Sequence, residues 1–137
     1  MALKQYIAAK AIIKNDQGQI LLLRQSLEDT VDGAGRYHAP GGIVEPGETL
    51  HQALKREILE ETKLEIEIIK TISVEEWQAN IRGDDCYFVG VFFECKLTGG
   101  ELDTTNDETS GFAWIDKNDL ENLEVLQPTR KVVESVL

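Results

Sequence analysis

The order of apolar and polar positions begins with two β-prone runs separated by turn residues. The runs lie within residues 6–26, and the tetrapeptide Asn15-Asp16-Gln17-Gly18 between them predicts a β-hairpin. A polar, Gly-containing loop follows. Clusters of glycine and proline then flank the apolar pair Ile43-Val44, which predicts turns on either side of a short strand.

The second half of the chain predicts further strands and a closing helix. Residues 64–77 alternate between apolar and polar positions, and residues 86–97 form a more apolar run. A polar loop leads to a short strand at residues 112–116, and residues 127–137 predict a helix with Pro128 in its first turn. With too few helices for a doubly wound parallel sheet, we expect an α+β fold, an α/β/α sandwich in which a mixed β-sheet lies between two or more helices.

One further helix is predicted after residue 48, and its apolar face contains carboxylates. Thr49 begins it, with Gln52 completing a capping box. The i, i+3, i+4, i+7 pattern of a buried stripe is followed by Leu50, Ala53, Leu54, Glu57 and Glu61. Like charges at this spacing destabilise a helix by a few tenths of a kcal/mol per pair. A partner outside the helix should offset that cost.

A divalent cation is the partner that this pattern favours. Glu57, Glu60 and Glu61 project from adjacent turns, and oxygen-rich clusters of this kind suit Mg²⁺ or Mn²⁺. The alternative is a solvated acidic helix face, in which Arg56 and Lys63 pair with Glu60. The position of the carboxylates on the stripe favours the metal.

Length, charge and cysteine usage narrow the class of protein. The 137 residues predict a single domain over 1–137, and the net charge of −11 argues against binding to a nucleic-acid polymer. There is no run of 18 apolar residues, so we expect no membrane span, and the N-terminus is unlike a signal peptide. Cys86 and Cys95 are expected to be buried free thiols of a cytoplasmic protein. The sequence leaves a homodimer open.

The helix and the loop before it resemble the Nudix box. That motif reads G, five residues, E, seven residues, R-E-U-x-E-E-x-G-U, where U is bulky and apolar. Residues 42–64 match eight of the nine specified positions, beginning at Gly42 and Glu48 and ending in the run Arg56 to Leu64. Lys63 replaces the second glycine. If the helix keeps a left-handed C-cap there, the lysine costs on the order of 1 kcal/mol.

The resemblance implies a Nudix-like fold and metal-dependent hydrolysis of a nucleoside diphosphate linked to another group. The carbonyl of Gly41 or Gly42 would assist three glutamates in holding Mg²⁺ or Mn²⁺, and Glu48 would pair with Arg56. The general base would be Glu57 or Glu108, with Asp107 behind them. The glutamates implied to hold the metal are Glu57, Glu60 and Glu61.

The substrate implied is a small nucleotide, a (d)NTP first and an ADP-ribose-like molecule next. Arg24 is a candidate for phosphate contact, and Tyr37 and Trp77 are candidates for stacking on a base. Trp114 is expected in the core, and His38 and His51 have no second ligand at metal-binding spacing. Two alternatives stay open: a catalytically silent nucleotide-binding or regulatory domain, and a protein that only buffers divalent cations.

Overall fold

The computed structural model describes residues 3–26, 34–106 and 109–137. The described chain folds into strands, two α-helices and a short 3₁₀ helix. These are β1 (Lys4–Lys14), β2 (Ile20–Gln25), β3 (Tyr37–His38), β4 (Gly41–Ile43), α1 (Leu50–Thr62), β5 (Leu64–Ile81), β6 (Asp84–Gly100), β7 (Thr109–Ile115), the 3₁₀ helix (Lys117–Asn122) and α2 (Thr129–Val136).

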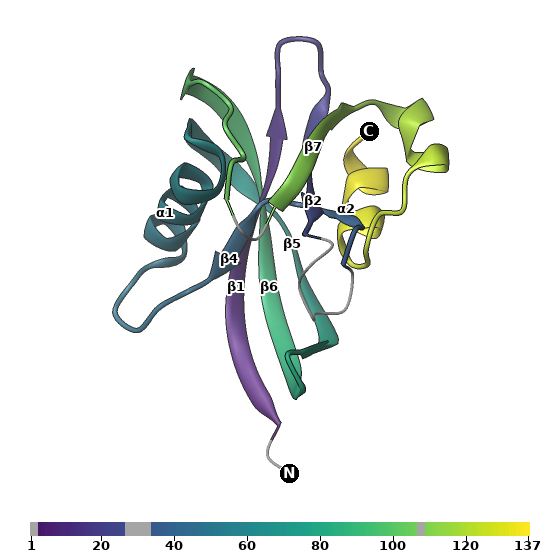
Figure 1. The fold of residues 1–137 in the computed structure, drawn as a ribbon. Helices are drawn as coiled ribbons and strands as arrows, with labels where there is room; N and C mark the ends of the chain where they lie inside the picture. Colours follow the sequence, from purple (N-terminus) through teal and green to yellow (C-terminus); the bar gives the residue numbers. More distant parts are fainter. Residues whose placement is uncertain (1–2, 27–33, 107–108) are drawn as a thin grey trace.

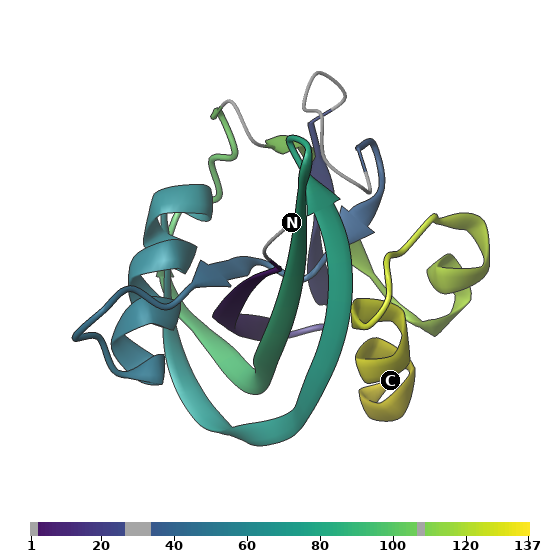
Figure 2. The same ribbon diagram turned by 90° about the horizontal axis from the view of Figure 1, so that it is seen from below.

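The strands form one mixed sheet with a helix on either side. Its main path is β3-β2-β1-β6-β5, while β4 pairs with β1 and β7 pairs with β2. Strands β1 and β6 run parallel, and the other pairings are antiparallel. Figure 1 shows α1 and α2 on opposite sides of the strands, and the view from below in Figure 2 shows the same arrangement. The predicted fold class is therefore confirmed.

Strands β1 and β2 have a core on each face, because successive side chains of a strand point in opposite directions. On β1, Ala9, Ala11 and Ile13 pack with Leu54 and Ile58 of α1 in the first core. Residues of the opposite parity enter a second core with α2, in a group that includes Ile12, Ile20, Leu22, Phe92, Val132 and Val133. Burial on both faces explains the continuous apolar runs Ala11–Ile13 of β1 and Ile20–Leu23 of β2.

Several boundaries differ from the prediction. The hairpin of β5 and β6 is longer than expected and turns at Arg82 and Gly83, whose φ angles are 50° and 88°. Positive φ at both central residues is the geometry of a tight two-residue hairpin turn. Strand β3 and the 3₁₀ helix were not predicted, since each is too short to show a clear hydrophobic period.

The two cysteines are free and buried, as expected. Burial raises the pKa of the Cys95 thiol to about 12, so this thiol stays protonated and unreactive. No helix in the described part of the chain is both long and apolar enough to span a bilayer.

Candidate active site

Helix α1 starts at the residue that the sequence predicts. Thr49 is the N-cap: its Oγ1 accepts a hydrogen bond from the Gln52 backbone N–H (3.1 Å), and Gln52 Oε1 accepts one from the Thr49 backbone N–H (2.9 Å). This reciprocal capping box satisfies two donors that the helix itself cannot pair. It fixes the register of the helix and therefore the direction of every carboxylate after it.

The buried stripe of α1 differs from the predicted one. It consists of Ala53, Leu54, Ile58 and Thr62, and Glu57 and Glu61 lie along its edge at intermediate exposure. The prediction that these carboxylates belong to the buried stripe is therefore wrong: the next residue in each case, Ile58 after Glu57 and Thr62 after Glu61, takes the buried position. The reason is that Ile58 and Thr62 complete the i, i+4 spacing inward, with the Thr62 hydroxyl donating to the Ile58 carbonyl (2.6 Å). A half-buried edge keeps the two carboxylates in reach of ligands.

The Gly41-Gly42 pair lies directly against these two carboxylates. The Gly41 backbone N–H donates to Glu61 Oε1 at 2.8 Å. A Cβ atom on Gly42 would come within 2.5 Å of the Glu57 carboxyl carbon, and one on Gly41, whose φ is 137°, would overlap the backbone of β1. Position 41 therefore requires glycine, whereas a side chain at position 42 would displace the Glu57 carboxylate.

The ladder between β1 and β4 distinguishes the two glycine carbonyls. Ala11 N–H donates to Pro40 O and Val44 N–H donates to Ile7 O, so alternate pairs along this ladder are hydrogen-bonded. By that alternation Gly42, opposite Ala9, directs its backbone groups to β1. Gly41, opposite Lys10, directs its own away from β1, which is why its N–H reaches Glu61.

Arg56 holds the outer side of the same helix turn. Its guanidinium makes two hydrogen bonds to Glu48, of 2.7 and 2.8 Å, one to Glu57 (2.8 Å) and one to Glu60 (3.4 Å). It also donates to the Ile43 carbonyl (3.3 Å). The hydrogen bonds from Arg56 lower the pKa of Glu48 to about 2, and those to Glu48 and Glu57 raise the pKa of Arg56. This fork ties the loop before α1 to the helix.

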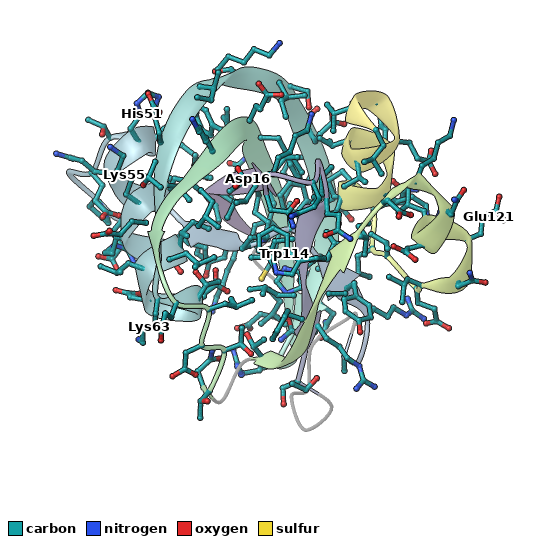
Figure 3. All side chains as sticks on the ribbon, turned by 90° about the horizontal axis from the view of Figure 1, so that it is seen from above. Asp16, His51, Lys55, Lys63, Trp114 and Glu121 are labelled. Atoms are coloured by element: carbon teal, nitrogen blue, oxygen red, sulfur yellow. The ribbon has the colours of Figure 1, made fainter. Side chains whose placement is uncertain are left out.

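The helix ends in a left-handed C-cap even though the residue there is not glycine. Lys63 has φ 63° and ψ 15°, and its backbone N–H donates to the Leu59 carbonyl. Figure 3 shows Lys63 at the end of α1. Of the two outcomes considered for this position, the helix keeps the glycine-type geometry and does not run further.

A cavity of about 320 Å³ opens beside the glycines. One end is lined by Gly41, Gly42 and Glu61. The other end is aromatic, because the Trp77 ring stacks on Phe88 with centroids 5.2 Å apart and planes inclined by 10°. The cavity therefore combines a polar, acidic end with a flat apolar wall.

Lys10 and His38 also line this cavity, and the sequence assigned neither of them to a site. His38 Nδ1 lies 2.9 Å from the Ala39 carbonyl oxygen, and burial lowers the pKa of this histidine to about 3. Burial also lowers the pKa of Lys10, while the charges of Glu61 and Glu57 act to raise it. The signal in the sequence was the charge inside the apolar run Ala8 to Ile13, on the face shared with Ala8 and Ile12.

The other predicted residues are dispersed. Trp77 lines the cavity, whereas Arg24 and Tyr37 are not among its lining residues. Arg24 donates to the Gly35 carbonyl (3.1 Å), and Tyr37 packs against the second core. Glu108 and Asp107 lie outside the described residues.

Two further aromatic-ring predictions can be placed. Trp114 packs against the first core, as predicted, and projects towards the middle of the molecule in Figure 3. His51 lies on the exposed side of α1, with its ring edge-on to Phe93 at 5.3 Å. Neither residue belongs to the cavity.

The donor chemistry at the acidic end fits a hard divalent cation. Glu61 lines the cavity and accepts from the Gly41 N–H, whereas Glu57 and Glu60, on the same turn of α1, are not among the lining residues. All three offer carboxylate oxygens of the kind that such an ion prefers. Across residues 3–26, 34–106 and 109–137, however, no three His, Cys, Asp or Glu side chains are gathered in a metal-binding group. Glu57 accepts from Arg56 and Glu61 accepts from Gly41, each through Oε1, and a carboxylate has further lone pairs with which it can bind a cation.

Comparison with protein families gives one match that covers nearly the whole chain. The model of the NUDIX domain matches residues 4–136. Nucleoside triphosphatase NudI of Escherichia fergusonii is 31% identical over 130 residues, which cover 89% of each chain. Putative nudix hydrolase 1 of Caenorhabditis elegans is 32% identical over 118 residues, which cover 84% of this chain and 30% of that protein.

A third relative is also similar to this chain, and a solved structure shares its fold. The mouse 8-oxo-dGDP phosphatase NUDT18 is 32% identical over 100 residues, and this chain covers 28% of its length. The chain thus spans less than a third of two of the curated relatives that it matches. Among solved structures, the MutT protein of Methanosarcina mazei has a TM-score of 0.81 at 23% identity, covering 99% of this chain and 95% of that one, and shows the same fold.

Proposed function

Since this chain belongs to the Nudix family, we propose that it hydrolyses the diphosphate bond of a nucleoside diphosphate linked to another group. The observation that carries the proposal is the shared cavity, where Glu61 and the two glycines lie at one end and the Trp77–Phe88 stack at the other. A phosphate chain suits the first end, where a cation can bridge it to carboxylates. A nucleobase suits the second.

The cation in this proposal is Mg²⁺ or Mn²⁺. Glu57, Glu60 and Glu61 would hold it, with the Gly41 carbonyl in preference to that of Gly42, because the Gly41 backbone faces away from β1. When bound, such an ion polarises phosphoryl oxygens and activates a water molecule for attack on phosphorus. The general base would be Glu57 or Glu108.

The roles of the supporting residues follow from their contacts. Arg56, which holds Glu48, Glu57 and Glu60, would keep the acidic turn of α1 at a constant distance from the loop before it. Gly42 would leave space for the Glu57 carboxylate to move between Arg56 and a cation. Trp77 would present its ring to the base.

The substrate class that we favour is a small nucleotide, a (d)NTP first and an ADP-ribose-like molecule second. A cavity of about 320 Å³ suits a single nucleoside. The Escherichia fergusonii relative, 89% of whose length matches this chain, is the nucleoside triphosphatase NudI, which supports the same order. The unpaired thiols of Cys86 and Cys95 support a reducing compartment such as the cytoplasm.

The test is a panel of purified nucleotides assayed for release of phosphate or pyrophosphate. It includes dNTPs, 8-oxo-dGTP, ADP-ribose, nucleotide sugars and dinucleoside polyphosphates, each with Mg²⁺, with Mn²⁺ and with EDTA. We expect turnover of one group that needs the cation and is lost in Glu61→Gln. A silent panel with retained nucleotide binding would instead favour a binding or regulatory domain, and cation binding without nucleotide binding would favour a cation buffer.

A further inference from the structure

Lys10 is placed at the junction between the acidic end and the apolar wall of the cavity. In the ladder of β1 and β4 it lies opposite Gly41, the residue whose N–H binds Glu61. In the parallel ladder with β6 it lies opposite Phe92, which lines the same cavity. Its side chain therefore emerges between the carboxylate and the aromatic residues.

The ammonium group of Lys10 has little to bind within the described part of the chain. Its nearest polar contact is His38 Nδ1, at 3.4 Å. A neutral imidazole carries one proton, and the shorter contact of Nδ1, at 2.9 Å, is to the Ala39 carbonyl oxygen. With the proton on Nδ1 for that bond, this nitrogen has no lone pair to offer Lys10. Lys10 also has no ion pair with a carboxylate of the described residues, although the charges of Glu61 and Glu57 act on it.

A bound metal ion would leave the positive charge of Lys10 without a compensating negative charge nearby. Glu61 and Glu57 are the negative charges that act on this ammonium. A divalent cation held by the same carboxylates would cancel that attraction and repel the lysine. A phosphate chain entering with the cation would supply anionic oxygens at this position, and an ammonium bonds to such oxygens strongly.

We propose that Lys10 is a substrate-contacting residue whose ammonium group binds an anionic phosphate oxygen of the nucleotide, between Glu61 and the aromatic wall. The proposal rests on the proposed function for the identity of the ligand. It adds a charged contact from strand β1 to a site whose other residues named above come from α1, β3, β4, β5 and β6. In this arrangement the lysine also orients the nucleotide, because binding a phosphate oxygen at this position directs the phosphate chain to Glu61 and the base to the aromatic wall.

The experiment uses inorganic tripolyphosphate, which offers phosphate oxygens without a base. Its binding in the presence of Mn²⁺, and the binding of Mn²⁺ alone, are measured by calorimetry on the wild-type protein and Lys10→Met. We expect the variant to bind tripolyphosphate about tenfold more weakly or worse. Mn²⁺ alone should bind equally well or more tightly, because removing a positive charge cannot repel the ion.

Three further variants complete the design. Lys14→Met is the matched control: it removes the same charge from the same strand, where Lys14 faces Glu94 at 3.6 Å outside the cavity. It should leave both affinities unchanged. Lys10→Arg should restore part of the binding, since it keeps the charge. Should Lys10→Met fail to fold, as judged by circular dichroism, Lys10→Gln takes its place.

Two results would overturn the proposal. One is a tripolyphosphate affinity that does not depend on Lys10, including the case in which the wild-type protein does not bind this anion. The other is an equal loss of Mn²⁺ affinity in the lysine variant, which would mean that Lys10 only orders the carboxylates. Failure of the proposed function has a separate signature, a silent nucleotide panel, and Lys10-dependent binding in that case would support a binding domain with this contact.

Discussion

Two positively charged side chains, Arg56 and Lys10, lie beside the acidic turn of α1, and they differ in how many contacts they make. On the outer side, Arg56 makes hydrogen bonds to Glu48, Glu57 and Glu60 and to a backbone carbonyl. On the inner side, Lys10 lies at the cavity wall with one long contact to a histidine nitrogen. The difference indicates a division of labour in which the outer cation fixes the helix turn and the inner one is left for a ligand.

The chemistry of the two side chains suits this division. A guanidinium offers a rigid fork of donors, which matches the two oxygens of Glu48 at 2.7 and 2.8 Å. An ammonium on a flexible stem adapts to a ligand that arrives from solution. Substitutions can separate the outer group from the inner one, or can remove the constraint at the end of the helix on which both groups depend.

The largest effect is expected from the two carboxylates, one in each group. Glu57 is bonded to the outer Arg56 and Glu61 to the inner Gly41. Glu57→Gln and Glu61→Gln should each lower kcat by about two orders of magnitude or more, because each removes a charge that would hold the cation. Turnover of the best nucleotide in the panel, with Mg²⁺, measures this.

The stability of the same variants should differ, and this difference is the control. The Glu61→Gln side chain keeps an oxygen that can accept from Gly41, and loses repulsion from Glu57 and Glu60, so its Tm in EDTA should equal or exceed that of the wild type. Glu57→Gln loses a charge-assisted bond to Arg56 and should be the less stable of the two. Full turnover in both variants would show that the site has been assigned to the wrong residues.

A smaller effect is expected in the pH dependence of stability. The pKa of Glu48 is about 2 in the folded protein, against 4.5 for an unperturbed carboxyl, because Arg56 bonds to its charged form. A lowered pKa contributes stability that is complete above pH 4.5 and is lost as the pH falls towards 2. Urea denaturation at a series of pH values should show that Glu48→Gln loses this part of the slope.

On the inner side, His38 gives a second pH range in which stability changes, and this range serves as the comparison. Burial, and then the charge of Lys10, lower the pKa of His38 to about 3 from 6.5. Its contribution is therefore complete above pH 6.5 and declines as the pH falls towards 3. Glu48→Gln should leave the decline between pH 6.5 and 4.5 intact. A variant that loses the upper range instead would contradict the assignment of the two ranges to the two sides of α1.

Most of the fold could be predicted because its signals are local. The capping box at Thr49, the turn at Asn15 and the alternation in residues 64–77 each depend on neighbours in the sequence, and all three are present. The two-residue strand β3 could not be predicted, because it is formed by pairing with β2 and not by a pattern of its own. Such an element depends on the completed sheet.

The site was predicted in part, and the same distinction explains which part. Spacing along one helix identifies Glu57 and Glu61, since the geometry of a helix is regular. The same spacing did not identify the buried stripe correctly, because Thr62, a polar residue, occupies a buried position on α1. Lys10 and His38 reach the cavity through pairing of β1 with β4 and of β3 with β2, and no local spacing encodes those contacts.

The smallest effect is expected at the end of α1, where Lys63 occupies a conformation that favours glycine. Its φ of 63° costs a residue with a Cβ atom about 1 kcal/mol. Lys63→Gly removes that strain, but it also frees the unfolded chain, at a cost of about 0.4–1 kcal/mol, and loses the 3.3 Å bond from Lys63 Nζ to the Glu60 carbonyl. We therefore expect stability equal to or slightly above that of the wild type, with activity retained.

Lys63→Ala separates these contributions, because alanine keeps the strain of a Cβ atom and loses only the lysine side chain. Lys63→Gly should be the more stable of the two in urea denaturation, since only glycine relieves the left-handed strain. If instead alanine equals glycine, the strain has already been relaxed around Lys63. If Lys63→Gly loses most of its activity while remaining folded, the lysine does more than end the helix, because the turn it closes carries Glu60 and Glu61.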